Sequence, residues 1–355
     1  MHAKRMKSLR DSFKGFGIDA LFVSSVPNVH YLTGFAGEDS FLLIGSEAAY
    51  LITDSRYTEE AEQTAKGVKV FTYRTDMFED AAKLAADMGV KKLGFEPDVM
   101  NCAMHGRMLL KFPKTRIIPA EGIVQKLRVL KSPAEVKMIE AAIAVAEDAL
   151  NATLPKLKRN VTETTIAREL RYNLSKAGAQ DVSFPPIVAF DAKSSLPHAR
   201  PGDAKLGKNA LVLFDWGARK DFYCSDCTRV FFIGNVPPVI EQIYDIVMEA
   251  DKRAAKALKP GVPLKDVDAV ARDYIRDKGY GDKFGHGLGH GVGIEIHEAP
   301  RLNSRSTEIA TPGMIVTIEA GIYLPGIGGI RVEDMALVTE KGCRILTHFP
   351  REPRF

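Results

Sequence analysis

Two acidic residues lie in apolar stretches that are placed to form a hairpin. Residues 211–215 are an apolar run that ends in Asp215, and the strand-like run 222–233 contains Asp226. If the chain turns at 220–221, the two carboxylates are directly opposite each other, roughly 5 Å apart at Cβ. Carboxylates held that close at an apolar site repel each other unless a proton or a cation lies between them. The pair therefore predicts a metal site.

A second pair of carboxylates has the same arrangement. Glu319 follows the strand-like residues 316–318, Glu333 follows the strand-like residues 330–332, and Gly326 is midway between the two acids. A hairpin that turns at Gly326 places both side chains on one face. A single acid of this kind is more often a solvated or salt-bridged side chain, but two pairs in apolar strands favour a metal centre.

Glycine-rich residues 285–298 lie between the two predicted hairpins and contain His286, His290 and His297, three of the eight histidines. We expect the glycines to let the backbone come close to a bound centre. The alternative is a flexible surface loop. The stretch has no G-x-G-x-x-G pattern, so phosphate binding is not indicated. Four carboxylates and one imidazole are enough ligands for two divalent ions, and such a set suits manganese or cobalt, with zinc as an alternative.

The four cysteines, Cys102, Cys224, Cys227 and Cys343, do not indicate a thiolate metal site. Cys224 and Cys227 form a C-x-x-C motif, but side chains three residues apart on a strand point to opposite faces. We interpret them as packing residues. Without a secretory segment or a run of 18 apolar residues, the expected protein is soluble and cytoplasmic, with reduced thiols.

The elements that hold these residues change character along the chain. Up to about residue 120, short apolar runs alternate with helix-like segments such as 58–65 and 77–88, which indicates an α/β domain. Ser132, Pro133 and Glu135 then form a helix-start signal. We place the domain boundary before that helix, which gives domains 1–125 and 126–355.

The second domain is predicted to be α+β, with helices covering a mainly antiparallel sheet. The expected helices are 133–154, 162–177, 238–258 and 264–278, and the expected strands are 209–216, 222–233, 314–323 and 330–339. Hydrophobic residues are 45% of the chain and charged residues 26%, as in soluble globular proteins. The net charge of +4 is too small to indicate nucleic acid or an anionic membrane as a partner.

Together these segments resemble the pita-bread metallopeptidases, in the two-domain branch of Xaa-Pro aminopeptidases (aminopeptidase P), prolidases and metal-free creatinases. The matching segments of the second domain are 196–198 (LPH), 215–217 (DWG), 223–229 (YCSDCTR), 287–293 (GLGHGVG), 297–298 (HE), 318–319 (IE) and 331–334 (RVED). The first domain is similar to the creatinase-like N-terminal domain through 28–35 and 53–57. One departure is Ala320, where the family usually has proline. The resemblance implies a creatinase-like α/β domain followed by a pita-bread catalytic domain.

The resemblance also implies the metal ligands. Asp215 would bind one ion, Asp226 and Glu333 would bridge both ions, and His290 and Glu319 would complete the second. It further implies that a hydroxide held between the ions attacks the peptide, with Glu319 as general base. Manganese is the expected metal, with cobalt or zinc as alternatives.

The remaining matches imply substrate contacts. His198 and His297 would contact the substrate amide and the tetrahedral intermediate, and His286 would line the pocket. Arg331 would hold a ligand carboxylate in place beside the substrate. The implied catalytic residues are therefore His198, His297 and Glu319, and the implied substrate-binding residues are His198, His286, His297 and Arg331.

The implied activity is hydrolysis of the Xaa-Pro bond at the N-terminus of peptides by a homodimer. The alternative is a prolidase restricted to dipeptides. A non-catalytic interaction module of the same fold is disfavoured because all five ligands are present. Metal-free creatinase chemistry has no need of two carboxylate pairs, and a methionine aminopeptidase would not carry the preceding α/β domain.

Overall fold

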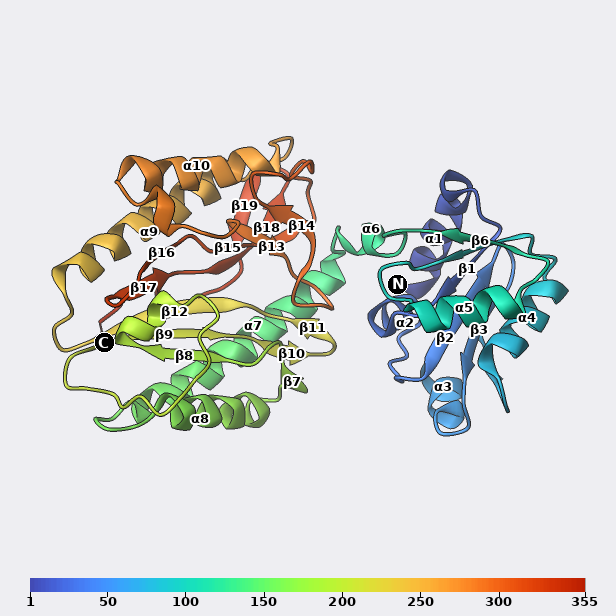
Figure 1. Ribbon diagram of the computed structural model, residues 1–355, viewed down its shortest axis with the longest axis horizontal. Coiled ribbons are helices and arrows are strands. Elements are labelled where there is room, and N and C mark those ends of the chain that lie inside the picture. The colour runs from blue at the N-terminus through green and yellow to red at the C-terminus, as the bar shows by residue number, and fades with distance from the viewer. Residues whose placement is uncertain (355) are drawn as a thin grey trace. The chain divides into compact units, whose positions relative to one another are not determined.

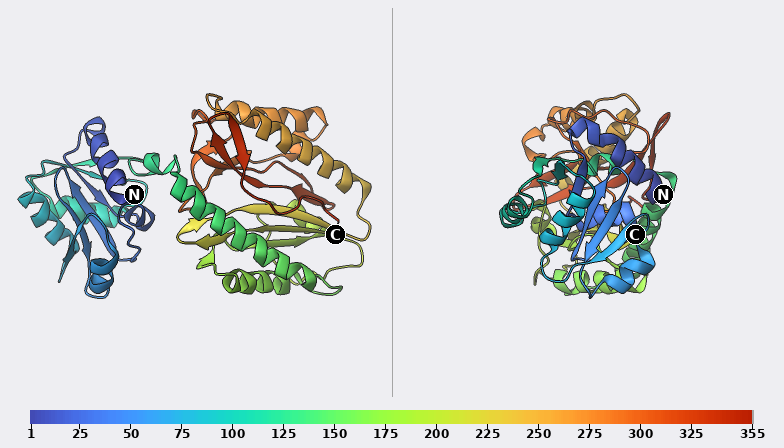
Figure 2. Two further views of the ribbon diagram at one scale, coloured as in Figure 1. Left: turned by 180° about the vertical axis from the view of Figure 1, so that it is seen from behind. Right: turned by 90° about the vertical axis from the view of Figure 1, so that its right-hand side faces the viewer.

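The computed structural model describes residues 1–354 as two compact units (Figures 1 and 2). The first unit is Met1–Arg128, and the second begins at Val129. Within residues 1–354, no helix is both long enough and apolar enough to cross a membrane.

The first unit is a six-stranded mixed sheet in the order β4-β3-β2-β1-β5-β6. Its strands are β1 (Ala20–Val23), β2 (Ser40–Gly45), β3 (Ala49–Thr53), β4 (Lys69–Thr72), β5 (Lys92–Phe95) and β6 (Arg116–Pro119). Its helices are α1 (His2–Phe16), α2 (Val26–Thr33), α3 (Thr58–Thr64), α4 (Met77–Asp87), α5 (Cys102–Lys111) and α6 (Gln125–Arg128). The central strands β1 and β2 are the apolar runs of the sequence and are almost wholly buried. The predicted α/β domain is confirmed.

The helices of the second unit begin where the sequence signals them. They are α7 (Pro133–Thr153), α8 (Glu163–Lys176), α9 (Pro238–Ala257) and α10 (Leu264–Asp277), with short 3-10 turns η1 (Leu154–Lys156), η2 (Asp191–Ser195) and η3 (Gly281–Lys283). At α7 the predicted capping box is present, because the Ser132 and Glu135 side chains each accept a hydrogen bond from the other's backbone N–H.

The strands of the second unit form antiparallel sheets. They are β7 (Asp181–Val182), β8 (Ile187–Phe190), β9 (Ala210–Trp216), β10 (Ala218–Lys220), β11 (Tyr223–Cys224), β12 (Cys227–Ile233), β13 (Gly289–Gly291), β14 (Glu298–Leu302), β15 (Ile315–Ile318), β16 (Gly321–Leu324), β17 (Gly328–Arg331), β18 (Asp334–Thr339) and β19 (Gly342–Ile345). Helices α7 and α8 cover the β12-β9-β8 sheet, whereas α9 and α10 cover the side formed by β13 to β19 (Figures 1 and 2). This is the predicted α+β arrangement.

The first hairpin forms, but its register differs from the prediction. The turn is at Asp221 and Phe222, both with positive φ, so Asp215 pairs with Thr228 instead of Asp226. Because the turn centre lies one residue later than predicted, the pairing shifts by two positions. A shift of two keeps a side chain on the same face. Asp226 is therefore a diagonal neighbour of Asp215 and still faces the same side.

The second hairpin has the predicted register. Ile318 pairs with Asp334 in β15 and β18, and Gly321 pairs with Arg331 in β16 and β17. Glu319 and Glu333 lie between these pairings, so the same register places them opposite each other.

The C-x-x-C cysteines are packing residues, as predicted. Both are buried free thiols, and Cys227 belongs to the core beneath α7 and α8. The Cys224 and Cys227 thiols donate to the backbone carbonyls of Ile294 and Glu333.

Candidate metal centre

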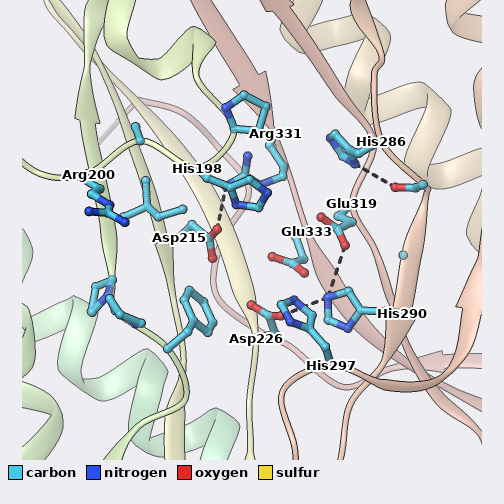
Figure 3. Close-up of a pocket in the computed structure, with 18 of the residues that line it drawn as sticks. His198, Arg200, Asp215, Asp226, His286, His290, His297, Glu319, Arg331 and Glu333 are labelled. Atoms are coloured by element: carbon cyan, nitrogen blue, oxygen red, sulfur yellow. Dashed lines mark hydrogen bonds and ion pairs between the residues drawn. The ribbon is translucent and has the colours of Figure 1, made fainter. Parts of the chain in front are cut away.

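The five predicted ligands converge from five separate places in the second unit (Figure 3). Asp215 lies near the end of β9, and Asp226 lies between β11 and β12. His290 is in β13, Glu319 follows β15, and Glu333 immediately precedes β18. All five side chains line one cavity. Residues separated by more than a hundred positions in the sequence thus meet at one point.

The tightest group within this set is Asp226, His290 and Glu333, each of which offers a ligand atom within 4.8 Å of the others. His290 Nε2 is 3.5 Å from Asp226 Oδ2 and 3.4 Å from Glu319 Oε1. The Asp215 Oδ1 atom is buried without a hydrogen-bond partner among the described residues. Buried oxygens are rarely left unsatisfied, so this atom points to a ligand such as a cation.

Burial and mutual repulsion make it unfavourable for the protein alone to hold so many negatively charged carboxylates together. Burial raises the pKa of Asp226 and of Glu333 well above its usual value, and repulsion from the neighbouring carboxylates raises both further. Burial also raises the pKa of Glu319 to about 7 and lowers that of His290 to about 3. His290 is therefore neutral near pH 7, which leaves a ring nitrogen free to act as a ligand.

The strand that carries His290 needs its glycines for packing. A Cβ at Gly289 would lie 2.1 Å from the Thr317 carbonyl oxygen, and one at Gly291 would lie 2.2 Å from the Ala299 carbonyl oxygen. These glycines allow close approach to the neighbouring backbone, not to a bound centre as the sequence suggested. The segment 288–294 is buried, which rules out the alternative of a flexible surface loop.

Arg331 connects three of the groups around the carboxylates. Its Nη2 atom is 2.7 Å from Asp215 Oδ2, and its Nη1 and Nε atoms donate to the hydroxyls of Tyr323 and Thr228. The Thr228 hydroxyl in turn donates to Glu333 Oε2 at 2.8 Å. Arg331 and Thr228 thus orient two of the carboxylates from outside the set.

The three other predicted histidines line the same cavity (Figure 3). The His297 ring lies edge-on to the His290 ring, with centroids 4.4 Å apart. The His286 Nε2 atom is 2.8 Å from the Tyr323 hydroxyl, and burial lowers the His286 pKa to about 4. His286 is thus tied to the protein through Tyr323.

Sequence reasoning missed several groups in or beside this cavity. Thr228 lies inside the matching segment 223–229, but its hydroxyl contact with Glu333 depends on the observed register of the hairpin. Tyr323 and two further arginines that line the cavity, Arg200 and Arg301, had no motif to mark them. The cavity of about 670 Å³ also has an apolar wall. Phe184, Pro185, Pro186, Ile187 and Pro197 form that wall.

The donor set fits divalent cations. Four clustered carboxylates, one neutral imidazole and an unpartnered oxygen of Asp215 supply the oxygen-rich environment that manganese, cobalt or zinc binds. No Lys or Arg within residues 1–354 forms an ion pair with Asp226, Glu319 or Glu333 in the structure, so the charge of these three carboxylates calls for cations.

The chain is similar to known proteins along nearly its whole length. Residues 137–340 match metallopeptidase family M24, and residues 5–130 match the creatinase/prolidase N-terminal domain. An Xaa-Pro dipeptidase from Pyrococcus horikoshii is 33% identical, with 98% of each chain covered.

Solved structures are equally similar. An Xaa-Pro dipeptidase from Bacillus anthracis is 37% identical with a TM-score of 0.97, and 99% of each chain is covered. An X-Pro aminopeptidase from Thermotoga maritima is 36% identical with a TM-score of 0.91, covering 97% of this chain and 99% of that one. The two-domain architecture expected from the sequence is thereby confirmed.

Proposed function

The chain belongs to metallopeptidase family M24, and we propose that this metal-dependent peptidase hydrolyses the Xaa-Pro bond of dipeptides. The observation that carries the proposal is the convergence of Asp215, Asp226, His290, Glu319 and Glu333 in one cavity of a fold shared with Xaa-Pro dipeptidases. The dipeptidase alternative now has better support than the aminopeptidase named first on sequence grounds.

We assign the ligands of two divalent ions, with manganese as the proposed metal. Asp215 would hold one ion, His290 and Glu319 the other, and Asp226 and Glu333 both. The free Asp215 Oδ1 atom and the Asp226, His290 and Glu333 group support this assignment. When bound, such ions lower the pKa of a coordinated water and stabilise negative charge on the attacked carbonyl.

The other cavity residues would handle the substrate and its protons. His198 and His297 face the same space as the carboxylates and can donate to the carbonyl oxygen that becomes negatively charged (Figure 3). The Thr317 hydroxyl holds Glu319 Oε1 at 3.1 Å. Glu319 is thus oriented to accept a proton from the attacking water and to pass it to the departing proline nitrogen. His286, which lines the pocket, and Arg331, bonded to Asp215, would fix the walls around the substrate.

The cavity suits a small substrate with a proline ring and a free carboxylate. The wall of Phe184, Pro185 and Ile187 offers an apolar surface to the ring, and about 670 Å³ is room for a dipeptide. Arg301 has no ion-pair partner within the described residues and lines the same cavity. We assign it the substrate carboxylate, which is the group that distinguishes a dipeptide from the interior of a longer chain.

Substrate length tests the proposal. Hydrolysis of an Xaa-Pro dipeptide is compared with that of the matching Xaa-Pro-Xaa tripeptide and the C-terminally amidated dipeptide. The dipeptide should be cleaved with the highest kcat/KM, and Arg301→Met should remove most of that advantage by raising KM. Equal or faster cleavage of the tripeptide would restore the aminopeptidase reading.

We further propose that the protein is a homodimer, as the family resemblance implies. Sedimentation velocity at micromolar concentration should give the mass of two chains. A monomer that keeps full activity would contradict this part of the proposal.

A further inference from the structure

One buried carboxylate fixes both ends of the segment that carries His198. Glu163 is the first residue of α8 and is fully buried. Its Oε1 atom accepts a hydrogen bond from the Phe190 backbone N–H at 2.9 Å, and its Oε2 atom accepts one from the Gly202 N–H at 2.8 Å. The loop 191–201, with His198 inside it, is therefore closed at its base by a single side chain.

The loop has a third bond to the same group. Lys193 Nζ lies 2.6 Å from Glu163 Oε2 and is 30% exposed, so the carboxylate has a partner of opposite charge. The Thr164 backbone N–H and hydroxyl both donate to the Gly202 carbonyl, which fastens the same end to the start of α8. Phe190 is also held by its strand pairing with β9. Gly202, at the other end of the loop, is held by hydrogen bonds to the first two residues of α8.

We propose that Glu163 is a positioning residue that keeps His198 directed into the cavity, an inference that rests on the substrate role proposed above for His198. Three bonds to one buried carboxylate are charge-assisted and therefore strong. Without them the loop gains conformational freedom, and a displacement of about 1 Å of a group that meets the substrate can cost about 100-fold in rate. No bond joins Glu163 to the five proposed metal ligands, so its loss should leave metal binding intact.

The test uses Glu163→Gln, which keeps the size of the side chain but presents donors to the Lys193 ammonium and the Gly202 N–H. We expect kcat/KM for an Xaa-Pro dipeptide to fall about 10- to 100-fold. Manganese stoichiometry should not change, and hydrogen exchange in residues 191–201 should become faster. Thr164→Val is the matched control, because it removes one neutral hydrogen bond to Gly202 at the same loop end but keeps the backbone bond; its activity should stay close to wild type.

A double-mutant cycle with His198→Ala separates the two roles. If Glu163 acts through His198, the Glu163→Gln change should lower the activity of the His198→Ala protein by no more than about twofold. Full multiplication of the two effects, unchanged exchange in the loop, or loss of metal in Glu163→Gln would overturn the inference. Wild-type activity of His198→Ala would instead contradict the role proposed for His198.

Lys193→Met answers the same question if Glu163→Gln does not fold. It removes the ion pair and leaves both backbone bonds in place, so we expect a smaller rise in exchange at 191–201 and a smaller loss of activity. No change in either quantity would contradict the inference.

Discussion

Asp226 and Glu333 are buried carboxylates whose pKa values are raised well above the usual range, and each is repelled by the other acids of the site. The protein holds them together although they weaken the metal-free fold. Such an arrangement is stabilised when a cation binds, because the repulsion then becomes attraction.

Asp226→Asn is therefore expected to separate activity from stability. The variant should lose peptide hydrolysis and bind manganese weakly, while the metal-free protein should melt at the same or a higher temperature because one repelling charge is gone. Calorimetry with and without manganese measures the metal binding and the melting temperature. Asp221→Asn, at the exposed turn of the same hairpin, is the matched control and should behave as wild type. Wild-type turnover by Asp226→Asn would show that the carboxylate is only structural.

Substitution of Arg331 tests whether the side chains that orient the proposed metal ligands affect metal binding. Its guanidinium bonds to Asp215, Tyr323 and Thr228 at once, which an ammonium group cannot reproduce in the same geometry. We expect Arg331→Lys to lower manganese affinity by about 10- to 100-fold, measured by titration calorimetry. An affinity equal to that of the wild type would mean that Asp215 keeps its orientation without this contact.

At the scale of elements, the sequence located the segments that form the two hairpins, but three of the four predicted strands are interrupted, at 225–226, 319–320 and 332–333. The second hairpin was placed correctly because Gly326 marks its turn. The first was placed one residue early because its turn uses Phe222 at positive φ, a conformation that an aromatic residue seldom adopts and that no sequence rule signals. The ligands were still identified, since a shift of two positions preserves the face. Contacts that depend on the true register, such as Thr228 with Glu333, could not be predicted.

The departure at Ala320 has a structural partner on α9. The Ala320 N–H, which proline would lack, donates to Asp251 Oδ1 at 2.9 Å, and Asp251 is buried. Burial raises the Asp251 pKa well above its ordinary value of 3.8, and repulsion by Asp334 and Glu319 adds to this. The neutral carboxyl is thus the form that the fold favours.

Asp251→Asn should become relatively more stable as the pH rises. A carboxyl whose folded pKa is raised stabilises the fold below its unfolded pKa and loses that contribution as the pH increases through the folded pKa. Asparagine stays neutral throughout. The two metal-free proteins should be most similar at about pH 3.5, below the unfolded pKa, and the variant should be more stable at about pH 8 by urea denaturation. A stability difference independent of pH would contradict a titrating Asp251.

At the scale of the whole molecule, the site belongs to the second unit alone. Every residue that lines the cavity lies between 184 and 333, whereas the first unit ends at Arg128. The family resemblance predicted both domains because their motifs are local in sequence. It did not identify Glu163, Arg301 or Tyr323, because their roles arise from contacts between distant segments.

A fragment that starts at Val129 should therefore fold and bind manganese with the stoichiometry of the full chain. Circular dichroism and titration calorimetry test this directly. A folded fragment that binds no metal would mean that the first unit helps to build the site.

The most direct test of the two-metal centre is metal titration of the stripped enzyme. Protein dialysed against a chelator should hydrolyse no Xaa-Pro dipeptide, and added manganese should restore activity up to a break at two equivalents per chain. Full activity in rigorously metal-free protein would contradict the metal centre, and a break at one equivalent would contradict its two-ion form.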